Sequence, residues 1–211
     1  MQINQNTLKT DLLNMSEKDF YIKHILKSRN WYFSHYKNLE GEEFVDEIDK
    51  FREIVSSTLK VGFLSVKIVG SAKLGFSLSP KHVLKPFEIS PQAENTSDID
   101  IAIISVKMFE ELWDKIRRTK EMYRPYNKAY YMDTAKSIYK GFINEHIMHK
   151  FPGLEQWWQK TISPTTQKLQ DKMSIEHPIT YRIYRSWEDI EEYQIHSIYK
   201  SKKELEKLNH V

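Results

Sequence analysis

The stretch from Val69 to Ile104 constrains the fold of this chain more than any other. It opens with Val-Gly-Ser-Ala-Lys-Leu-Gly and closes with Ser-Asp-Ile-Asp-Ile-Ala-Ile-Ile. In the closing part, isoleucines alternate with Asp98 and Asp100. Because successive side chains of a strand point to opposite faces, this alternation predicts a strand with both aspartates on one face.

The two aspartates predict a metal site. Carboxylates side by side on one face repel each other unless a cation or strong hydrogen-bond donors lie between them. Oxygen ligands suit a hard ion such as magnesium, which takes one or two carboxylates and completes its shell with substrate phosphates. We therefore expect Asp98 and Asp100 to bind Mg²⁺ or Mn²⁺.

The opening part of the stretch predicts a phosphate site. Gly70 and Ser71 follow an apolar segment, residues 64–69, and lead into a turn and a short helix. A strand–Gly–helix junction of this kind exposes backbone N–H groups to an anion. Lys73 adds a positive charge nearby, either as a contact to the phosphates or as an ordinary solvated loop lysine. A phosphate site beside a metal-binding pair indicates phosphoryl or nucleotidyl transfer.

This combination resembles the signature of the polymerase-β-type nucleotidyltransferase superfamily, in which Gly-Ser is followed by Asp-x-Asp on a strand. The matching residues are Gly70, Ser71, Asp98 and Asp100, and the resemblance covers residues 63–104. It implies an α+β fold in which a small mixed sheet packs with helices, with additional helices at both ends of the chain. It also implies two metal ions and an NTP whose triphosphate lies against the Gly-Ser turn, where a nearby base such as Lys73 contacts it.

The chain departs from the pattern of that family in two respects. Residues 72–97 separate the serine from the first aspartate, which is a longer interval than in the compact members. The family also carries a third carboxylate on a later strand, whereas the best later strand here, residues 179–185, contains no acid. Glu176, just ahead of that strand, is the nearest candidate. Loss of this carboxylate would remove part of the machinery that binds the metal and activates the attacking hydroxyl.

Two functions follow from these expectations. The first is a metal-dependent nucleotidyltransferase that moves an NMP from an NTP to an unidentified hydroxyl of a protein, a nucleotide or an RNA, and releases pyrophosphate. The second is a catalytically degenerate nucleotide- or protein-binding module of the same fold. In a third interpretation, Asp98 and Asp100 merely decorate the end of a strand.

Composition restricts the class of protein. The 211 residues include 32 Lys and Arg against 29 Asp and Glu, a net charge of +3 that is weak evidence for a polyanionic partner. The absence of cysteine excludes disulfides, zinc–thiolate sites and thiol catalysis. The first residues are polar, and the apolar runs fall far short of the ~20 residues that cross a bilayer, so we expect a cytoplasmic protein with no membrane partner.

The rest of the chain predicts helices around the metal strand. We expect residues 1–60 to form a helical segment packed on the core, and residues 61–211 to form that core with C-terminal helices, as one compact unit. Patterns of apolar residues predict further elements: helices over residues 16–36, 44–59, 105–118 and 133–149, a shorter helix interrupted at Ser163-Pro164, a strand over 179–185, and a last helix capped by Ser186. Two features stay open: Arg182 is either a phosphate contact or a surface arginine, and the basic–aromatic stretch Tyr123–Tyr131 either stacks on bases or anchors a loop.

Overall fold

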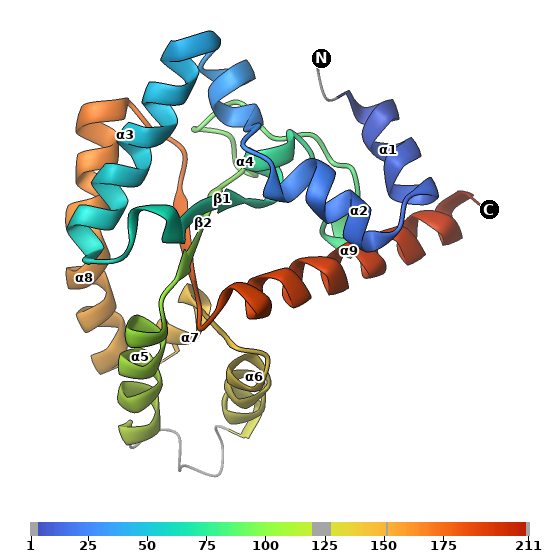
Figure 1. Ribbon diagram of the computed structural model, residues 1–211. Coiled ribbons are helices and arrows are strands. Elements are labelled where there is room, and N and C mark those ends of the chain that lie inside the picture. The colour runs from blue at the N-terminus through green and yellow to red at the C-terminus, as the bar shows by residue number, and fades with distance from the viewer. Residues whose placement is uncertain (1–3, 120–127, 151, 210–211) are drawn as a thin grey trace.

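The computed structural model describes residues 4–119, 128–150 and 152–209. It shows a mixed α+β fold in which a small four-stranded sheet is surrounded by helices (Figure 1). In chain order the elements are α1 (Gln5–Asn14), α2 (Glu17–Phe20), η1 (Tyr21–Leu26), η2 (Tyr32–Tyr36), α3 (Gly41–Leu59), η3 (Phe63–Ser65), β1 (Val66–Val69), α4 (Gly70–Leu74), η4 (Pro80–His82), β2 (Ile99–Ile104), α5 (Val106–Arg118), α6 (Lys128–Tyr139), β3 (Phe142–Asn144), α7 (Glu145–Met148), α8 (Pro152–Met173), β4 (Ile179–Tyr184) and α9 (Trp187–Asn209).

The sheet has the strand order β1-β2-β4-β3. β1 runs antiparallel to β2, β2 runs parallel to β4, and β3 runs antiparallel to β4. The metal-binding strand predicted from the sequence is β2, and it lies in the middle of the sheet. In the register of the sheet, Asp100 has Val69 beside it on β1 and Thr180 beside it on β4.

One face of the sheet carries the main hydrophobic core. Ile99, Ile101 and Ile103 of β2 point to this face, together with Tyr181 and Ile183 of β4. α3 and α8 cover it and lie side by side in Figure 1. Each buried side chain of this size contributes roughly 1.5–3 kcal/mol. The register of β2 is therefore strongly favoured, because a shift of the strand by one residue would expose the isoleucines and bury the aspartates in the core.

The opposite face is only partly covered. Ala102 and Ile104 of β2 and Tyr184 of β4 pack under the first turns of α9, against Ile190 and Tyr193. The following turns of α9 leave the sheet and pack against α1 and α2, through Ile198 and Leu205 in a separate small core (Figure 1). The start of β2, where Asp98 and Asp100 lie, remains partly accessible to solvent.

Three predicted helices differ from the structure. Residues 16–36 do not form one helix, because α2 leads into the π-helical turn η1 and an irregular link then separates it from η2. The predicted helix 133–149 is interrupted by β3, because Gly141, at φ +72°, ends α6 and the next residues pair with β4. The predicted break at Ser163-Pro164 is absent, and α8 continues through Pro164. Trp158 and Leu169, on either side of that proline, are both fully buried, and their packing holds the helix together.

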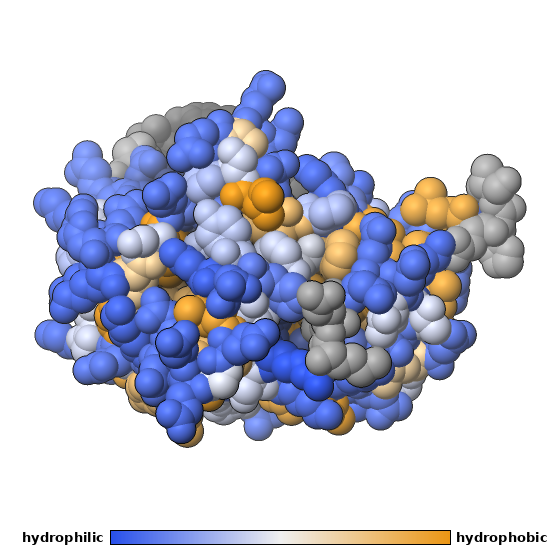
Figure 2. Space-filling model, turned by 90° about the horizontal axis from the view of Figure 1, so that it is seen from above, coloured by the Kyte–Doolittle hydropathy of each residue, from blue (hydrophilic) through white to orange (hydrophobic). Residues whose placement is uncertain are grey.

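The surface is mostly hydrophilic. Seen from above, hydrophobic side chains form several separate patches between hydrophilic ones (Figure 2). None of the helices in the described parts of the chain combines the length and the apolar character that crossing a bilayer requires.

Candidate functional site

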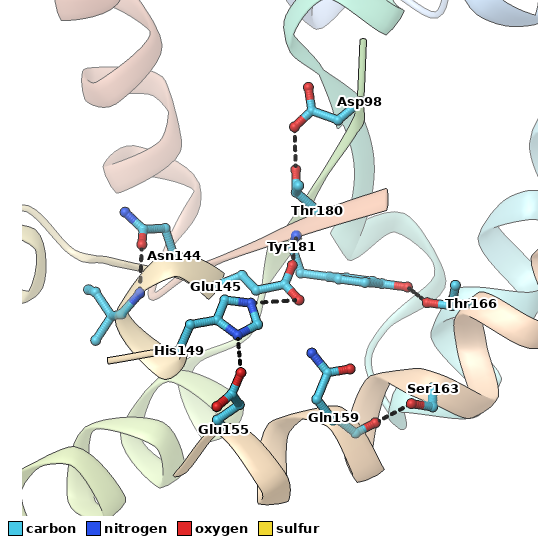
Figure 3. Close-up of polar contacts among 11 residues, drawn as sticks. Asp98, Asn144, Glu145, His149, Glu155, Gln159, Ser163, Thr166, Thr180 and Tyr181 are labelled. Atoms are coloured by element: carbon cyan, nitrogen blue, oxygen red, sulfur yellow. Dashed lines mark hydrogen bonds and ion pairs between the residues drawn. The ribbon is translucent and has the colours of Figure 1, made fainter. Parts of the chain in front are cut away.

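The two aspartates of the predicted metal site lie on one face of the sheet and share a hydrogen-bond donor. The hydroxyl of Thr180 is 3.2 Å from Oδ2 of Asp98 and 3.1 Å from Oδ1 of Asp100. Figure 3 shows the contact between Asp98 and Thr180. A hydroxyl has a single hydrogen, so it donates to one carboxylate at a time or divides its hydrogen between them. The two carboxylates are thus within reach of one small group placed between them.

The glycine of the predicted phosphate turn lies directly against this pair. Gly70 has φ +67°, a left-handed conformation that residues with a side chain rarely adopt. A Cβ atom on Gly70 would lie 2.2 Å from Oδ2 of Asp100. The backbone therefore turns here only because residue 70 has no side chain, and the turn brings the chain onto the carboxylate. Ser71 follows in the first turn of α4 and is partly accessible.

The surroundings of Asp100 disfavour its ionised form. The pKa of Asp100 is raised to about 6: burial and the neighbouring charge of Asp98 raise it, whereas Arg182 and the hydroxyl of Thr180 lower it in part. The side chain still has some access to solvent, so Asp100 does not lie in a closed core. A partly buried carboxylate beside a second carboxylate is the arrangement that a bound cation relieves.

Arg182 lies on the same face of the sheet as the aspartates. It stands beside Ala102 of β2, and its guanidinium carbon lies 4.7 Å from the ring centre of Tyr193 and 5.7 Å from that of Phe142. The Nε atom is buried without a hydrogen-bond partner. The arginine is therefore fixed at the site by two aromatic rings, and its positive charge acts on Asp100. Arg182 is only partly accessible, which disfavours the surface arginine of the two interpretations, and the phosphate contact stays a prediction.

The structure does not bring the amine of Lys73 to the aspartates. Lys73 is buried, and its amine donates to the backbone carbonyls of Lys27 and Arg29, after the end of η1. The pKa of Lys73 is lowered to about 7, chiefly by burial and in addition by the charges of Lys67 and Arg52. Its position three residues after Gly70 on α4 turns it toward this link between η1 and η2. The sequence pattern contains no signal for that contact, since it joins segments more than forty residues apart.

A third acid does not join the pair within the part of the chain that the structure describes. Glu176 is exposed, and its charge acts on Lys37 and Tyr32 instead. Asp189 is bound by Arg185 through two hydrogen bonds of 2.9 and 3.0 Å. Across the described ranges, no cluster of three or more acidic, histidine or cysteine side chains is arranged to hold a metal ion. The position on β4 that faces the pair is occupied by Thr180.

The donor set nevertheless fits one hard divalent cation. Two carboxylates converge at one point, with a pKa of about 6 for Asp100 that indicates poorly compensated negative charge. Magnesium commonly takes one or two carboxylates and completes its octahedral shell with water and substrate phosphates. Asp98 and Asp100 are the residues that would hold it.

A second polar network supports the start of β4 from the opposite face. The carboxylate of Glu145 accepts a hydrogen bond of 3.0 Å from the backbone N–H of Tyr181, and His149 lies between Glu145 and Glu155 (Figure 3). Burial raises the pKa of Glu145, whereas the hydrogen bonds that it accepts lower it. The network fixes Tyr181, the residue after Thr180. The sequence placed Glu145 and His149 on a helix, and the strand contact became visible only in the structure.

The basic–aromatic stretch Tyr123–Tyr131 lies mostly outside the described residues. Tyr131, within α6, is exposed. Comparison of the chain with protein-family models, with curated proteins and with solved structures gives no match.

Proposed function

We propose that the protein is a metal-dependent nucleotidyltransferase that transfers an NMP from an NTP to a hydroxyl acceptor and releases pyrophosphate. The observation that carries this proposal is the convergence of Asp98, Asp100 and the Gly70 turn at one point. The two aspartates without the glycine turn, or the turn without the aspartates, would support the proposal far less. The acidic pair and the turn come from two neighbouring strands, as the resemblance to polymerase-β-type enzymes implies.

Asp98 and Asp100 would hold Mg²⁺ or Mn²⁺, which supplies positive charge against the phosphates when it is bound. In the transfer, the acceptor oxygen forms a bond to the α-phosphorus, the bond from that phosphorus to the bridging oxygen breaks and its electron pair leaves with pyrophosphate, and the proton of the acceptor hydroxyl passes to water. The Gly70-Ser71 turn would orient the triphosphate for in-line attack. Catalysis would consist mainly of positioning and charge neutralisation, as in other phosphoryl transfers.

The balance of charge at the site favours a polyanionic substrate. With both aspartates ionised, two carboxylates face one guanidinium, that of Arg182, which leaves one negative charge. A divalent cation would change this into one positive charge, at a partly buried site where electrostatic interactions are stronger than in water. A triphosphate would then be attracted, whereas the metal-free site would repel it.

The alternative function is a nucleotide-binding module without turnover. It is favoured by one observation, the neutral hydroxyl of Thr180 at the position on β4 that faces the pair. A hydroxyl whose single hydrogen is directed to these carboxylates does not accept the proton of an attacking group as a third carboxylate would. Under this alternative the protein would bind NTP and metal but release no pyrophosphate.

One experiment separates the two functions. The protein is incubated with each α-labelled NTP, Mg²⁺ or Mn²⁺ and cell extract as the source of acceptors, beside an Asp98→Ala/Asp100→Ala variant and an Asp114→Ala variant. Asp114 is a carboxylate of α5 paired with Arg117 and Arg118, so its loss controls for removal of an acidic side chain away from the site. Label transfer and pyrophosphate release that disappear only in the double variant support the enzyme. NTP binding by calorimetry without release supports the binding module, and the absence of both defeats the proposal.

A further inference from the structure

A groove of about 600 Å³ lies between the end of α6 and the middle of α9. Its lining combines two tyrosines with basic side chains: Tyr139 and Tyr193, with Lys140, His196 and Lys200. Glu192 is the acidic residue of the lining, and Pro80 closes the groove from the segment between β1 and β2. The function proposed above assigns nothing to this groove.

Tyr139 is the more exposed of the two tyrosines of the groove lining. It is 89% exposed although it lies at the edge of the groove. The backbone around it is fixed, because the N–H groups of Lys140 and Gly141 donate to Lys136 and Ile138 at the end of α6. An exposed aromatic ring on a fixed stretch of backbone is a platform on which a nucleobase can stack.

The basic side chains of the groove have no acidic partner. Among the described residues, neither Lys140 nor Lys200 forms an ion pair, although exposed lysines elsewhere on α9 do. Burial lowers the pKa of His196, and both lysines lower it further, so both charges lie close to the imidazole. Two unpaired ammonium groups on one groove suit the phosphates of a nucleic-acid backbone.

The groove adjoins the candidate site through one shared side chain. Tyr193 lines the groove, and its ring also lies 4.7 Å from the guanidinium carbon of Arg182. Arg182 in turn lowers the pKa of Asp100 by its charge. Tyr193 and Arg182 thus connect the groove to the carboxylate pair.

We propose that this groove binds single-stranded nucleic acid, with a base stacked on Tyr139 and phosphates on Lys140 and Lys200. Single strands fit better than duplexes, because stacking on a side chain requires an unpaired base. The further step, that the bound strand carries the acceptor hydroxyl, rests on the proposed nucleotidyl transfer. The binding itself does not rest on it.

The test is fluorescence anisotropy with a labelled single-stranded RNA of about 12 nucleotides, a length in the range that one such module covers. The full chain is used in EDTA, so that the metal site does not contribute. Tyr139→Ala should weaken binding at least about fivefold, since one base stack accounts for that much. Lys140→Ala/Lys200→Ala should flatten the plot of log affinity against log salt by about 1.4, from about 0.7 for each lost phosphate contact.

The matched controls are exposed tyrosine and lysine side chains that lie outside the groove. Tyr199→Ala removes a half-exposed tyrosine of α9 that is absent from the groove lining, and Lys107→Ala/Lys160→Ala removes two exposed lysines of other helices. Both should bind RNA as the unaltered protein does. Equal loss in the controls, equal affinity for a duplex, or no binding by the unaltered protein would overturn the groove proposal.

The outcomes for the groove and for the reaction can be told apart. RNA binding that persists in the Asp98→Ala/Asp100→Ala variant, without any transfer by the unaltered protein, leaves the groove standing and removes the reaction. The opposite outcome is transfer to a protein or a small nucleotide without any RNA binding. If Tyr139→Ala leaves that transfer unchanged, the reaction stands and the groove proposal falls.

Discussion

Gly70 lies so close to the carboxylate of Asp100 that a side chain at position 70 would clash with it. A Cβ there would lie 2.2 Å from Oδ2 of Asp100, and the backbone of Gly70 is already in the left-handed region. Such a contact joins the predicted phosphate turn to the predicted metal pair. A single added methyl group, in Gly70→Ala, is therefore enough to test this contact.

Gly70→Ala should lower the free energy of unfolding by roughly 1–3 kcal/mol, since the added Cβ meets both the carboxylate and an unfavourable φ. It should also abolish the protection that Mn²⁺ gives against unfolding, because the carboxylate is displaced. Urea unfolding with and without Mn²⁺ measures both effects. Gly153→Ala is the matched control, since a Cβ at Gly153 meets no atom within 4 Å. Equal behaviour of the two variants would contradict the contact.

Asp100→Asn should stabilise the protein at pH 7 and have little effect near pH 4. The pKa of Asp100 is raised to about 6 in the folded protein, from an ordinary value of 3.8, so the folded state binds the proton more tightly than the unfolded state. Stability contributed by this group is therefore lost as the pH rises from about 4 to about 6, by roughly 2–3 kcal/mol. Urea unfolding of both proteins between these pH values measures the difference.

Asp114→Asn provides the control of opposite sign for that experiment. The hydrogen bonds from Arg117 and Arg118 hold the pKa of Asp114 below its ordinary value, so its loss should not stabilise the protein at pH 7. Mn²⁺ should reverse the effect at Asp100, because the cation stabilises the ionised form. A gain in stability from Asp100→Asn that is the same at pH 4 and pH 7 would show that ionisation is not its cause.

Thr180→Val should remove the hydrogen bond shared by the two aspartates while it keeps the shape of the side chain. The hydroxyl lowers the pKa of Asp100, so the variant should raise that pKa further. Stability at pH 7 should fall by roughly 1–3 kcal/mol, as for other buried groups that lose a partner. Titration of the Asp100 carboxyl by carbon-detected NMR measures the pKa. Thr166→Val, which removes a hydrogen bond to Tyr181, controls for loss of a hydroxyl and should leave the Asp100 titration unchanged.

Glu145→Ala should destabilise β4 more than Glu145→Gln. The alanine variant leaves the N–H of Tyr181 without its acceptor, at a cost of roughly 1–3 kcal/mol, whereas glutamine retains an amide oxygen that accepts the same bond. Hydrogen exchange of the Tyr181 amide measures this directly, with faster exchange expected for alanine only. Glu155→Ala removes the more exposed carboxylate of the same network and serves as control. Slow exchange in Glu145→Ala would show that the bond does not protect the strand.

The local parts of the fold were predictable because local rules determine them. Ser186 was expected to cap a helix, and its hydroxyl accepts the N–H group of Asp189 at the start of α9. The alternation in β2 likewise placed Asp98 and Asp100 on one face, since backbone geometry requires it. By contrast, β3 was missed because three residues carry no periodic signal, and only pairing with β4 makes them a strand.

By itself, the sequence determined that two acids share a face of a strand and that a glycine turn precedes them, because both follow from the period and conformational freedom of the backbone over a few residues. Only the tertiary structure decided what surrounds them. The register of β4 places Thr180 beside Asp100, and the packing of α9 places Tyr193 against Arg182. The amine of Lys73 binds the carbonyl of Lys27, after η1, and does not reach the aspartates. These partners are distant in the chain, and their positions depend on how whole elements bury their apolar faces, which no local pattern encodes.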